Sequence, residues 1–366
     1  MPRVTISVAP RPYEAIIESG LIERAGNRLR EALGTKNKLF VVTVAPVRRR
    51  WGSRLFSSLK NAGFESQWVE MPDGEPGKKV ATVERLAEKM LRLRADRDAA
   101  LIAFGGGVVG DVAGLLASLY MRGVDLVQIP TTVLAQVDAS IGGKTGVNLR
   151  LGKNLLGTFH QPRVVLIDPE VLSTLPQREF RAGIYEAVKC GVIGRPELFR
   201  RLERTEAKML RKDAAIREWM IAEAVRLKAE IVAADEREGG LRRLLNFGHT
   251  IGHALEALTG YRRFLHGEAV GWGMVAVTHI SREMGRCAEQ VFQSITGAVL
   301  NLGPLPRVEV SGRGVLRAIQ GDKKTRNGAV HFVLPREIGK VEIANDVPDA
   351  AIHSAIEKIR ELSTSQ

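Results

Sequence analysis

Histidines and acidic residues in the second half of the chain are the groups best suited to hold a divalent metal. His249 and His253 are four residues apart, which places both imidazoles on one face of a helix. This spacing by itself is typical of a zinc pair, and two ordinary helix histidines are the alternative interpretation. His266 follows in a His-Gly-Glu segment. In an earlier helix, Glu186 and Lys189 lie three residues apart, a spacing that in isolation indicates a solvated ion pair.

Glycines in the first half of the chain could bind phosphate groups. The run 105–111 contains Gly105, Gly107 and Gly110 in a GxGxxG spacing, after an apolar strand and at the start of a helix. Such a loop can hold a pyrophosphate at the helix N-terminus. The acidic residue expected about twenty positions further on is not clearly present, so a tight strand–helix turn that needs glycine for packing fits equally well.

A second segment, residues 128–148, joins an apolar strand to a Pro-Thr-Thr turn, an isolated Asp138, two glycines and Lys144. The glycines allow backbone N–H groups to approach an anion closely, and the lysine supplies a point charge. The segment therefore predicts a second set of anion-binding groups.

The composition favours small anionic partners. The chain has 366 residues, 45% of them hydrophobic, and a net charge of +13. Only 5% of residues are aromatic and no basic run is longer than 48–50, which argues against nucleic acid as the main ligand. Cys190 and Cys287 form no CxxC pair, and we expect reduced thiols. Without an apolar leader or a membrane-length segment, we expect a cytoplasmic protein that uses no membrane.

Two kinds of element must position these groups. In the first half, strands expected at 39–44, 66–71, 99–104, 124–129 and 164–167 alternate with helices at 47–62, 80–94 and 111–121, which predicts a parallel sheet covered on both faces. Later, helical patterns cover 180–193, 196–210, 213–235, 249–258 and 268–284, with a hairpin over 330–343 and a frayed tail after residue 362. We predict a Rossmann-like α/β domain at 1–175, followed by a mainly α-helical domain at 176–366.

The motifs of this chain, and their order along it, resemble those of the 3-dehydroquinate synthases, which belong to the sugar-phosphate cyclases. The resemblance covers roughly residues 70–340. It rests on the segment 128–148, GGGVxGD at 105–111, DGExxK at 73–78, AGxxExxK at 182–189, NFGHT at 246–250 and HGE at 266–268. Ala139 replaces a common serine and Pro76-Gly77 replaces a typical Gln-Tyr, which puts the shape of the loop at the cofactor ribose in doubt.

The resemblance implies a dehydroquinate synthase-like fold and a cytoplasmic lyase of the shikimate pathway, which serves chorismate and aromatic amino acid biosynthesis. Such an enzyme converts 3-deoxy-D-arabino-heptulosonate 7-phosphate to 3-dehydroquinate and phosphate. The steps are transient oxidation by NAD, phosphate elimination, re-reduction and intramolecular aldol closure. The implied cofactors are NAD and one divalent metal, zinc or cobalt. The implied metal ligands are Glu186, His249 and His266, whereas His253 faces the substrate.

The resemblance also assigns cofactor and substrate groups residue by residue. The positions implied to bind NAD are Asp73, Gly74, Glu75, Lys78, Gly105, Gly106, Gly107, Gly110, Asp111, Thr131, Thr132, Lys144, Lys153, Leu172, Thr174 and Leu175. Arg242 and Lys228 would hold the substrate carboxylate, and the phosphate would contact Lys144, Asn154, His253 and either Lys323 or Lys324. Asp138, Glu238 and Asn246 would bind hydroxyls, and Lys189 would face the hydroxyl that is oxidised. Arg122 would reach the partner's site in a homodimer.

Three alternatives remain open at this point. Another sugar-phosphate cyclase, making valiolone- or inosose-type rings, should alter the carboxylate-binding set, and Lys228, Arg242, Asn246 and His253 are all present here. A metal-dependent polyol dehydrogenase would accumulate NADH, unlike a cyclase. A nucleic-acid-binding protein would show salt-sensitive binding and release no phosphate.

Overall fold

The computed structural model describes residues 2–323 and 330–365, and the chain forms two compact units. The first unit comprises Met1–Pro176 and Ala214–Ala233, and the second comprises Gln177–Asp213 and Ala234–Gln366. The linear division at residue 175 stays a prediction, and helix α8 (Ala214–Ala234) belongs to the first unit although it lies in the C-terminal half of the sequence.

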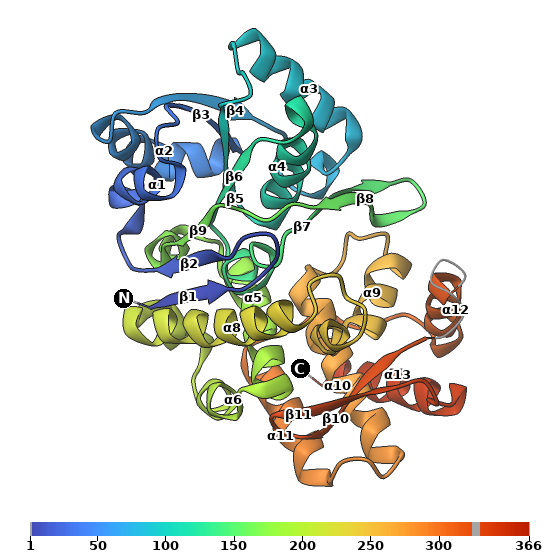
Figure 1. Cartoon of the computed structure of the whole chain (residues 1–366). Coiled ribbons are helices and arrows are strands. Elements are labelled where there is room, and N and C mark those ends of the chain that lie inside the picture. The colour runs from blue at the N-terminus through green and yellow to red at the C-terminus, as the bar shows by residue number, and fades with distance from the viewer. Residues whose placement is uncertain (1, 324–329, 366) are drawn as a thin grey trace. The chain divides into compact units, whose positions relative to one another are not determined.

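A seven-stranded sheet organises the first unit, in the order β1-β2-β9-β6-β5-β3-β4 (Figure 1). The strands are β1 (Arg3–Ile6), β2 (Tyr13–Ile17), β3 (Lys38–Thr43), β4 (Glu65–Glu70), β5 (Ala100–Gly105), β6 (Asp125–Pro130) and β9 (Val164–Ile167). The pair β1–β2 is antiparallel, and every other neighbouring pair is parallel. The predicted Rossmann-like parallel sheet is confirmed.

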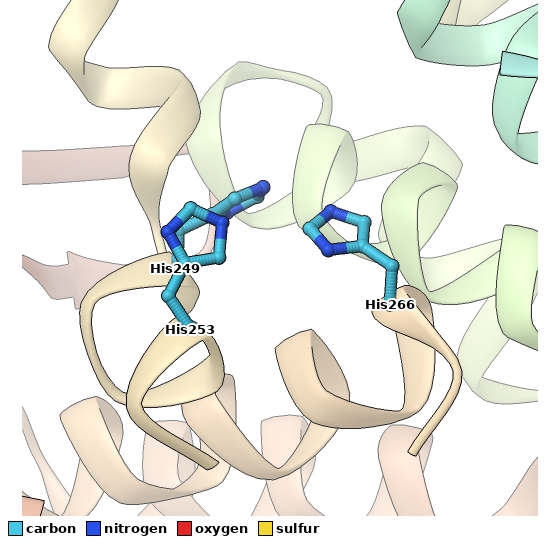
Figure 2. Close-up of side chains that lie close together, drawn as sticks. All are labelled: His249, His253 and His266. Atoms are coloured by element: carbon cyan, nitrogen blue, oxygen red, sulfur yellow. The ribbon is translucent and has the colours of Figure 1, made fainter. Parts of the chain in front are cut away.

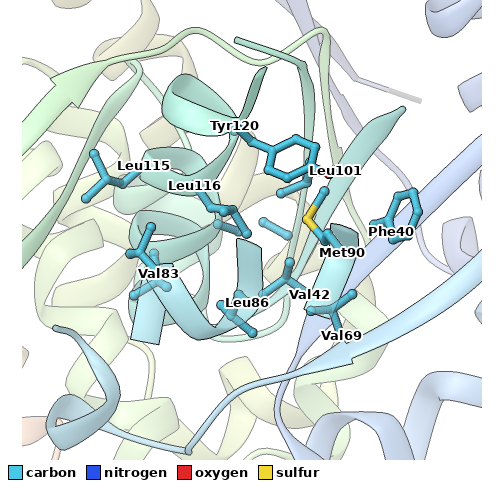
Figure 3. Packing of buried hydrophobic residues seen from close by; sticks show 14 of the residues in the cluster. Phe40, Val42, Val69, Val83, Leu86, Met90, Leu101, Leu115, Leu116 and Tyr120 are labelled. Atoms are coloured by element: carbon cyan, nitrogen blue, oxygen red, sulfur yellow. The ribbon is translucent and has the colours of Figure 1, made fainter. Parts of the chain in front are cut away.

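Helices lie against this sheet because their apolar residues recur on one face. They are α1 (Ala25–Leu33), α2 (Ala45–Asn61), α3 (Val80–Arg92) and α4 (Gly107–Leu119). The α3 residues Val83, Leu86 and Met90 pack with strand residues such as Val42 and Leu101 (Figure 3). Each such buried side chain contributes about 1.5–3 kcal/mol relative to exposure. The spacing predicted for this helix is confirmed.

A hairpin that the sequence patterns did not reveal lies between β6 and β9 in the sequence. Strand β7 (Lys144–Leu149) pairs antiparallel with β8 (Gly152–Phe159). A Cβ atom at Gly157 would lie 2.0 Å from the carbonyl oxygen of Thr145, so only glycine permits the two strands to approach this closely. This hairpin supplies several of the predicted anion-binding residues.

The second unit is mainly helical, as predicted, and contains the small hairpin of β10 (Phe332–Glu337) and β11 (Lys340–Ala344). Its helices are α5 (Gln177–Gly194), α6 (Pro196–Glu203), α7 (Ala207–Lys212), α9 (His249–Leu258), α10 (His266–Glu283), α11 (Glu289–Asn301), α12 (Gly312–Lys323) and α13 (Asp349–Thr364). A Cβ atom at Gly267 of α10 would lie 1.7 Å from the carbonyl oxygen of Ala182 in α5. Glycine at this position therefore lets α5 and α10, which carry predicted metal ligands, pack in direct contact.

Two details of the helical prediction are wrong. The single helix expected over 196–210 is divided into α6 and α7, because Glu206 adopts an extended conformation. The tail expected to fray after residue 362 continues α13 to Thr364, since the buried hydroxyl of Ser363 accepts a hydrogen bond from the Val308 amide at 3.0 Å. Within the described residues, no helix has the combination of length and apolar composition that crossing a membrane requires.

Candidate functional site

The glycine-rich loop lies between β5 and α4, as the sequence predicts. A Cβ atom at Gly105 would lie 2.5 Å from Val109, and one at Gly110 would lie 3.0 Å from the Gln128 side chain. Glycine is therefore required at these two positions because a larger side chain would clash with neighbouring side chains of the protein. Gly106 caps α4 without a side-chain hydrogen bond, and the first helical turn carries no acidic residue. The amide groups and the positive end of the α4 dipole are therefore suited to a phosphate group.

A buried lysine connects three elements near this loop. Lys78 Nζ lies 2.5 Å from Asp111 Oδ2 in α4 and 2.5 Å from Asn154 Oδ1 in β8. Burial raises the pKa of Asp111, and Lys78 opposes that rise. Asn154 has a φ of 57°, and its backbone N–H donates to Asn148 Oδ1. The structure thus assembles two predicted cofactor residues and one predicted substrate residue into one hydrogen-bonded cluster.

The DGExxK motif at 73–78, which we call the ribose-loop motif, contacts the hairpin of β7 and β8. Asn148 donates to Glu75 Oε1 at 2.7 Å, and Lys153 Nζ lies 3.6 Å from the same oxygen. Asp73 and Gly74 lie in the exposed turn before the 3-10 helix η2 (Glu75–Gly77), and Gly74 has a φ of 77°. The motif is therefore held by the hairpin, and is not a free surface turn.

The remaining predicted cofactor residues lie at the ends of strands and turns. Thr131 donates its amide to the Gly105 carbonyl, and Thr132 Oγ1 accepts from the Ala135 amide. Leu172 is buried in the 3-10 helix η5 (Pro169–Thr174), which Leu175 follows, and Thr174 Oγ1 accepts from the Trp51 indole at 2.9 Å.

Two predicted substrate residues of the first unit contact each other. Lys228 of α8 lies 2.7 Å from Asp138 Oδ1 and donates to the Asp138 carbonyl at 2.6 Å. Asp138 lies in the short π-helix η4 (Ala135–Ala139). Lys144 is exposed at the start of β7, and Arg122, also exposed, has a φ of 70°. Lys228 and Asp138, 90 residues apart, are brought together by the placement of α8 in the first unit.

Three imidazoles converge in the second unit. Figure 2 shows His249 and His253 of α9 and His266 of α10 with their rings turned toward one another. One nitrogen from each ring lies within 4.8 Å of the others. Glu186 of α5 joins this group, because its Oε1 is 3.4 Å from His266 Nε2 and 3.6 Å from His249 Nε2.

Glu186 is the group in this cluster that a cation would stabilise most. Both of its oxygens are buried, and neither has a hydrogen-bond partner of acceptable geometry among the described residues. Lys189 Nζ nevertheless lies 2.6 Å from Oε2 as an ion pair. A buried carboxylate without hydrogen bonds is costly. One carboxylate and imidazole nitrogens are suitable ligands for zinc or cobalt, and the residues present therefore fit a divalent metal.

The two imidazoles beside Glu186 differ in charge. Burial and the neighbouring Lys189 lower the pKa of His249 to about 3, which keeps this ring in the neutral form that binds metals. Burial works against protonation of His266, but Glu186 and Glu256 raise its pKa to about 10. Burial likewise opposes ionisation of Glu186, but Lys189 and the imidazoles lower its pKa well below the ordinary value. The cluster therefore holds opposite charges in close proximity.

The segment before α9 contains three of the predicted substrate residues, Glu238, Arg242 and Asn246. The Asp235 carboxylate accepts hydrogen bonds from the amides of Arg242, Gly240 and Gly239, which lower its pKa to about 2. The buried Arg242 guanidinium donates to the Glu236 carbonyl.

Asn246, at the end of the 3-10 helix η6 (Leu241–Asn246), donates to Glu238 Oε1 at 3.0 Å. Lys323 is the last residue of α12, and Lys324 lies outside the described residues. Glu238 and Asn246 are therefore the two predicted hydroxyl-binding residues that this unit brings into direct contact.

Sequence reasoning missed the roles of two carboxylates: Glu256 contacts the His266 ring, and Glu268 caps the helix that begins at His266. Glu256 is 2% exposed, and its Oε2 lies 3.2 Å from His266 Nδ1. Glu268 accepts from the Leu265 amide at 2.8 Å and from Arg178 through both carboxylate oxygens. The Glu in the HGE segment was a usable signal for the helix start, because glutamate at the third helical position caps the first turn. No local pattern pairs Glu256 with His266.

Two family models match consecutive parts of the chain. The family model for the N-terminal part of 3-dehydroquinate synthases matches residues 68–182, and the family model for the C-terminal part matches residues 183–325. A 3-dehydroquinate synthase of Koribacter versatilis (strain Ellin345) is 53% identical over 363 residues, with 99% of each chain covered.

Solved structures of sugar-phosphate cyclases share the fold. A 2-epi-5-epi-valiolone synthase from Streptomyces hygroscopicus subsp. jinggangensis 5008, with NAD+ and Zn2+ bound, is 31% identical with a TM-score of 0.88, covering 97% of this chain and 99% of that one. A 2-deoxy-scyllo-inosose synthase, complexed with carbaglucose-6-phosphate, NAD+ and Co2+, is 24% identical with a TM-score of 0.82, covering 98% and 99%. At that lower identity the likeness concerns the fold.

Proposed function

This chain belongs to the 3-dehydroquinate synthase family, and we propose from that premise that it converts 3-deoxy-D-arabino-heptulosonate 7-phosphate to 3-dehydroquinate and inorganic phosphate. The observation that carries the proposal is the buried Glu186 carboxylate, which has no hydrogen bond from the described residues and lies beside the imidazoles of His249 and His266. This arrangement suits a catalytic metal and is of little use for stability alone.

The proposed cofactors are NAD and one zinc or cobalt ion. The α4 N-terminus with its glycine loop, Lys78, Glu75 and the Thr131-Thr132 turn would hold NAD, together with the other positions assigned from the family resemblance. Glu186, His249 and His266 would hold the metal, and His253 would face the substrate. When bound, these groups supply reversible oxidation of a hydroxyl and stabilisation of negative charge on oxygen.

The chain's own residues bind and orient the substrate. Arg242 and Lys228 would bind the carboxylate, for which the Arg242 guanidinium can make two parallel hydrogen bonds. Lys144, Asn154, His253 and a lysine at 323 or 324 would bind the phosphate. Asp138, Glu238 and Asn246 would accept from or donate to hydroxyls, and the ammonium of Lys189 would stabilise the oxygen of the hydroxyl that loses its proton.

The rival ring products are less well supported. The valiolone synthase at 31% identity shares the fold, and its structure contains NAD+ and Zn2+. The curated relative at 53% identity is a 3-dehydroquinate synthase, and Arg242, whose guanidinium is suited to a carboxylate, is present in this chain. A polyol dehydrogenase would leave NADH as a product, which gives a direct test.

We further propose a homodimer. Large hydrophobic side chains of the first unit are exposed along β8, at Leu155, Leu156 and Phe159, and at the end of α4 and just after it, at Leu119 and Met121. Arg122, which follows Met121 in the sequence and is also exposed, would reach the site of the second copy. Sedimentation should give a dimer for the parent and a monomer for Leu156→Asp, and a monomeric parent would contradict this proposal. The cytoplasmic location and the absence of a nucleic-acid partner stay predictions of the sequence.

The decisive experiment measures phosphate release from the heptulosonate phosphate, with NADH absorbance followed in the same cuvette. We expect stoichiometric phosphate and 3-dehydroquinate, no lasting NADH signal, and loss of turnover when a chelator is present. Added Zn2+ or Co2+ should restore turnover. Lasting NADH accumulation, or phosphate release that chelation leaves unchanged, would contradict the assignment.

A further inference from the structure

The two imidazoles nearest Glu186 are held by different kinds of partner. His249 Nδ1 lies 3.2 Å from the carbonyl oxygen of Phe247, a short-range contact at the start of α9. His266 Nδ1 lies 3.2 Å from Glu256 Oε2, a side chain on a different helix. In both rings the other nitrogen, Nε2, is the one nearest Glu186.

Glu256 is firmly placed by its own surroundings. Its side chain is 2% exposed, and it lies near the C-terminal end of α9. Its carbonyl oxygen accepts from the Tyr261 amide at 2.8 Å and from the Thr259 hydroxyl at 3.2 Å, so the backbone that carries it is anchored. A carboxylate this buried requires a polar partner, and His266 supplies one.

We propose that Glu256 is a positioning residue of the metal centre. Its carboxylate accepts the Nδ1–H of His266, and this selects the tautomer in which Nε2 is free to bind the metal. The same contact fixes the ring orientation and adds a negative charge that balances a divalent cation. Helix α9 then carries one ligand, His249, and also the residue that orients a second ligand on α10.

This inference rests on the proposed metal site, and metal affinity tests it directly. Substituting a carboxylate that orients a metal-binding histidine typically costs about 10- to 100-fold in affinity. We expect Glu256→Gln, which keeps one acceptor oxygen, to weaken Zn2+ binding about tenfold, and Glu256→Leu to approach about a hundredfold. The visible absorption spectrum of the Co2+-loaded protein should shift in both variants.

Glu283→Gln provides a matched control. Glu283 Oε1 lies 3.1 Å from His279 Nε2 in the same unit, so the substitution removes another His–carboxylate contact outside the imidazole cluster. It should leave Zn2+ affinity and the Co2+ spectrum unchanged. Unaltered affinity and spectrum in both Glu256 variants would overturn the inference, whereas failure of the parent protein to bind metal would overturn the proposed function itself.

A measurement on the unmodified holoprotein keeps the test valid if the variants do not fold. In Zn2+-loaded protein with 15N-labelled histidine, the long-range 1H–15N spectrum should show His266 protonated at Nδ1 and metal-bound at Nε2. Metal binding through Nδ1, or an Nδ1 without a proton, would overturn the inference.

Discussion

Two clusters of buried charged groups differ in how their charges are compensated. The lysine cluster of the first unit consists of Lys78, Asp111 and Asn154. The imidazole cluster of the second unit consists of His249, His253 and His266 together with Glu186. Lys78 contacts both Asp111 and Asn154 at 2.5 Å, so its ammonium and its neighbours satisfy one another. The Glu186 side chain is more deeply buried, and its oxygens accept no hydrogen bond from the described residues. The first cluster is linked by its own hydrogen bonds, whereas in the second the Glu186 carboxylate is compensated by the ion pair with Lys189, and a bound metal would add contacts to its oxygens.

This difference indicates distinct roles. The lysine cluster ties β8 and α4 to the segment that carries the ribose-loop motif, and thereby shapes a surface made mostly of backbone groups. The imidazole cluster places the Glu186 carboxylate, whose oxygens accept no hydrogen bond from the described residues, beside three imidazoles, which destabilises the metal-free protein and favours metal binding. Substitutions should therefore affect stability and cofactor affinity in the first case, and metal content and turnover in the second.

The largest expected effect comes from His266→Ala. Loss of the metal removes several kcal/mol of charge stabilisation, which corresponds to a fall in kcat of about a thousandfold. Metal content measured by atomic absorption should drop with kcat, while NAD affinity measured by calorimetry should stay within about twofold, because the glycine loop belongs to the other unit. His331→Ala, at an exposed histidine, is the control. Normal turnover in His266→Ala would refute the ligand assignment.

The next largest effect should come from Lys78→Met. Removing one partner of a buried ion pair leaves the Asp111 carboxylate uncompensated and should lower the free energy of unfolding by about 3 kcal/mol. Urea denaturation measures this loss. In Lys78→Met/Asp111→Asn, the second substitution removes the stranded charge and should restore part of the stability. An equal loss in the single and double variants would show that the pair is not electrostatically coupled.

Arg242→Ala should mainly affect capture of the substrate. A hydrogen bond to a charged group contributes about 1.5–3 kcal/mol, which corresponds to roughly a 10- to 100-fold rise in KM. Steady-state kinetics should show this rise, with NAD affinity and metal content unchanged. Arg243→Ala, the neighbouring position, serves as the control. An unchanged KM would argue against a carboxylate-binding role for Arg242.

The smallest effect concerns Asp235 and pH. Hydrogen bonds from the Arg242, Gly240 and Gly239 amides lower its pKa from 3.8 to about 2, so its contribution to stability is present above the unfolded value and is lost as pH falls toward 2. Asp235→Asn should lower Tm by about 2 °C at neutral pH. Thermal unfolding should show this deficit shrinking between pH 4 and pH 2. A deficit that does not change with pH would mean that the carboxylate charge has no part in holding the loop.

Much of the fold was predictable because it depends on local periodicity. Apolar runs predicted five of the seven strands of the main sheet, and helical spacing such as that of Val83, Leu86 and Met90 predicted α2, α3 and α4. The elements β1, β2 and α1 were not predicted. The hairpin of β7 and β8 was not predictable, because Gly146, Gly152 and Gly157 interrupt the alternation that marks a strand. Nor does any local pattern of α8 indicate that it belongs to the first unit, since a helix with apolar residues around most of its circumference has no single preferred face.

The amino-acid sequence by itself determined the types of chemistry available, namely a glycine loop at a helix start and histidines paired at helical spacing, because both are properties of a few consecutive residues. The tertiary structure alone decided which distant groups meet. Glu186, His249 and His266 come from three helices, and Glu256 reaches His266 from a fourth position in the sequence. The physical reason is that close helix packing, permitted by glycines such as Gly267, sets these distances, and no spacing along the chain encodes them.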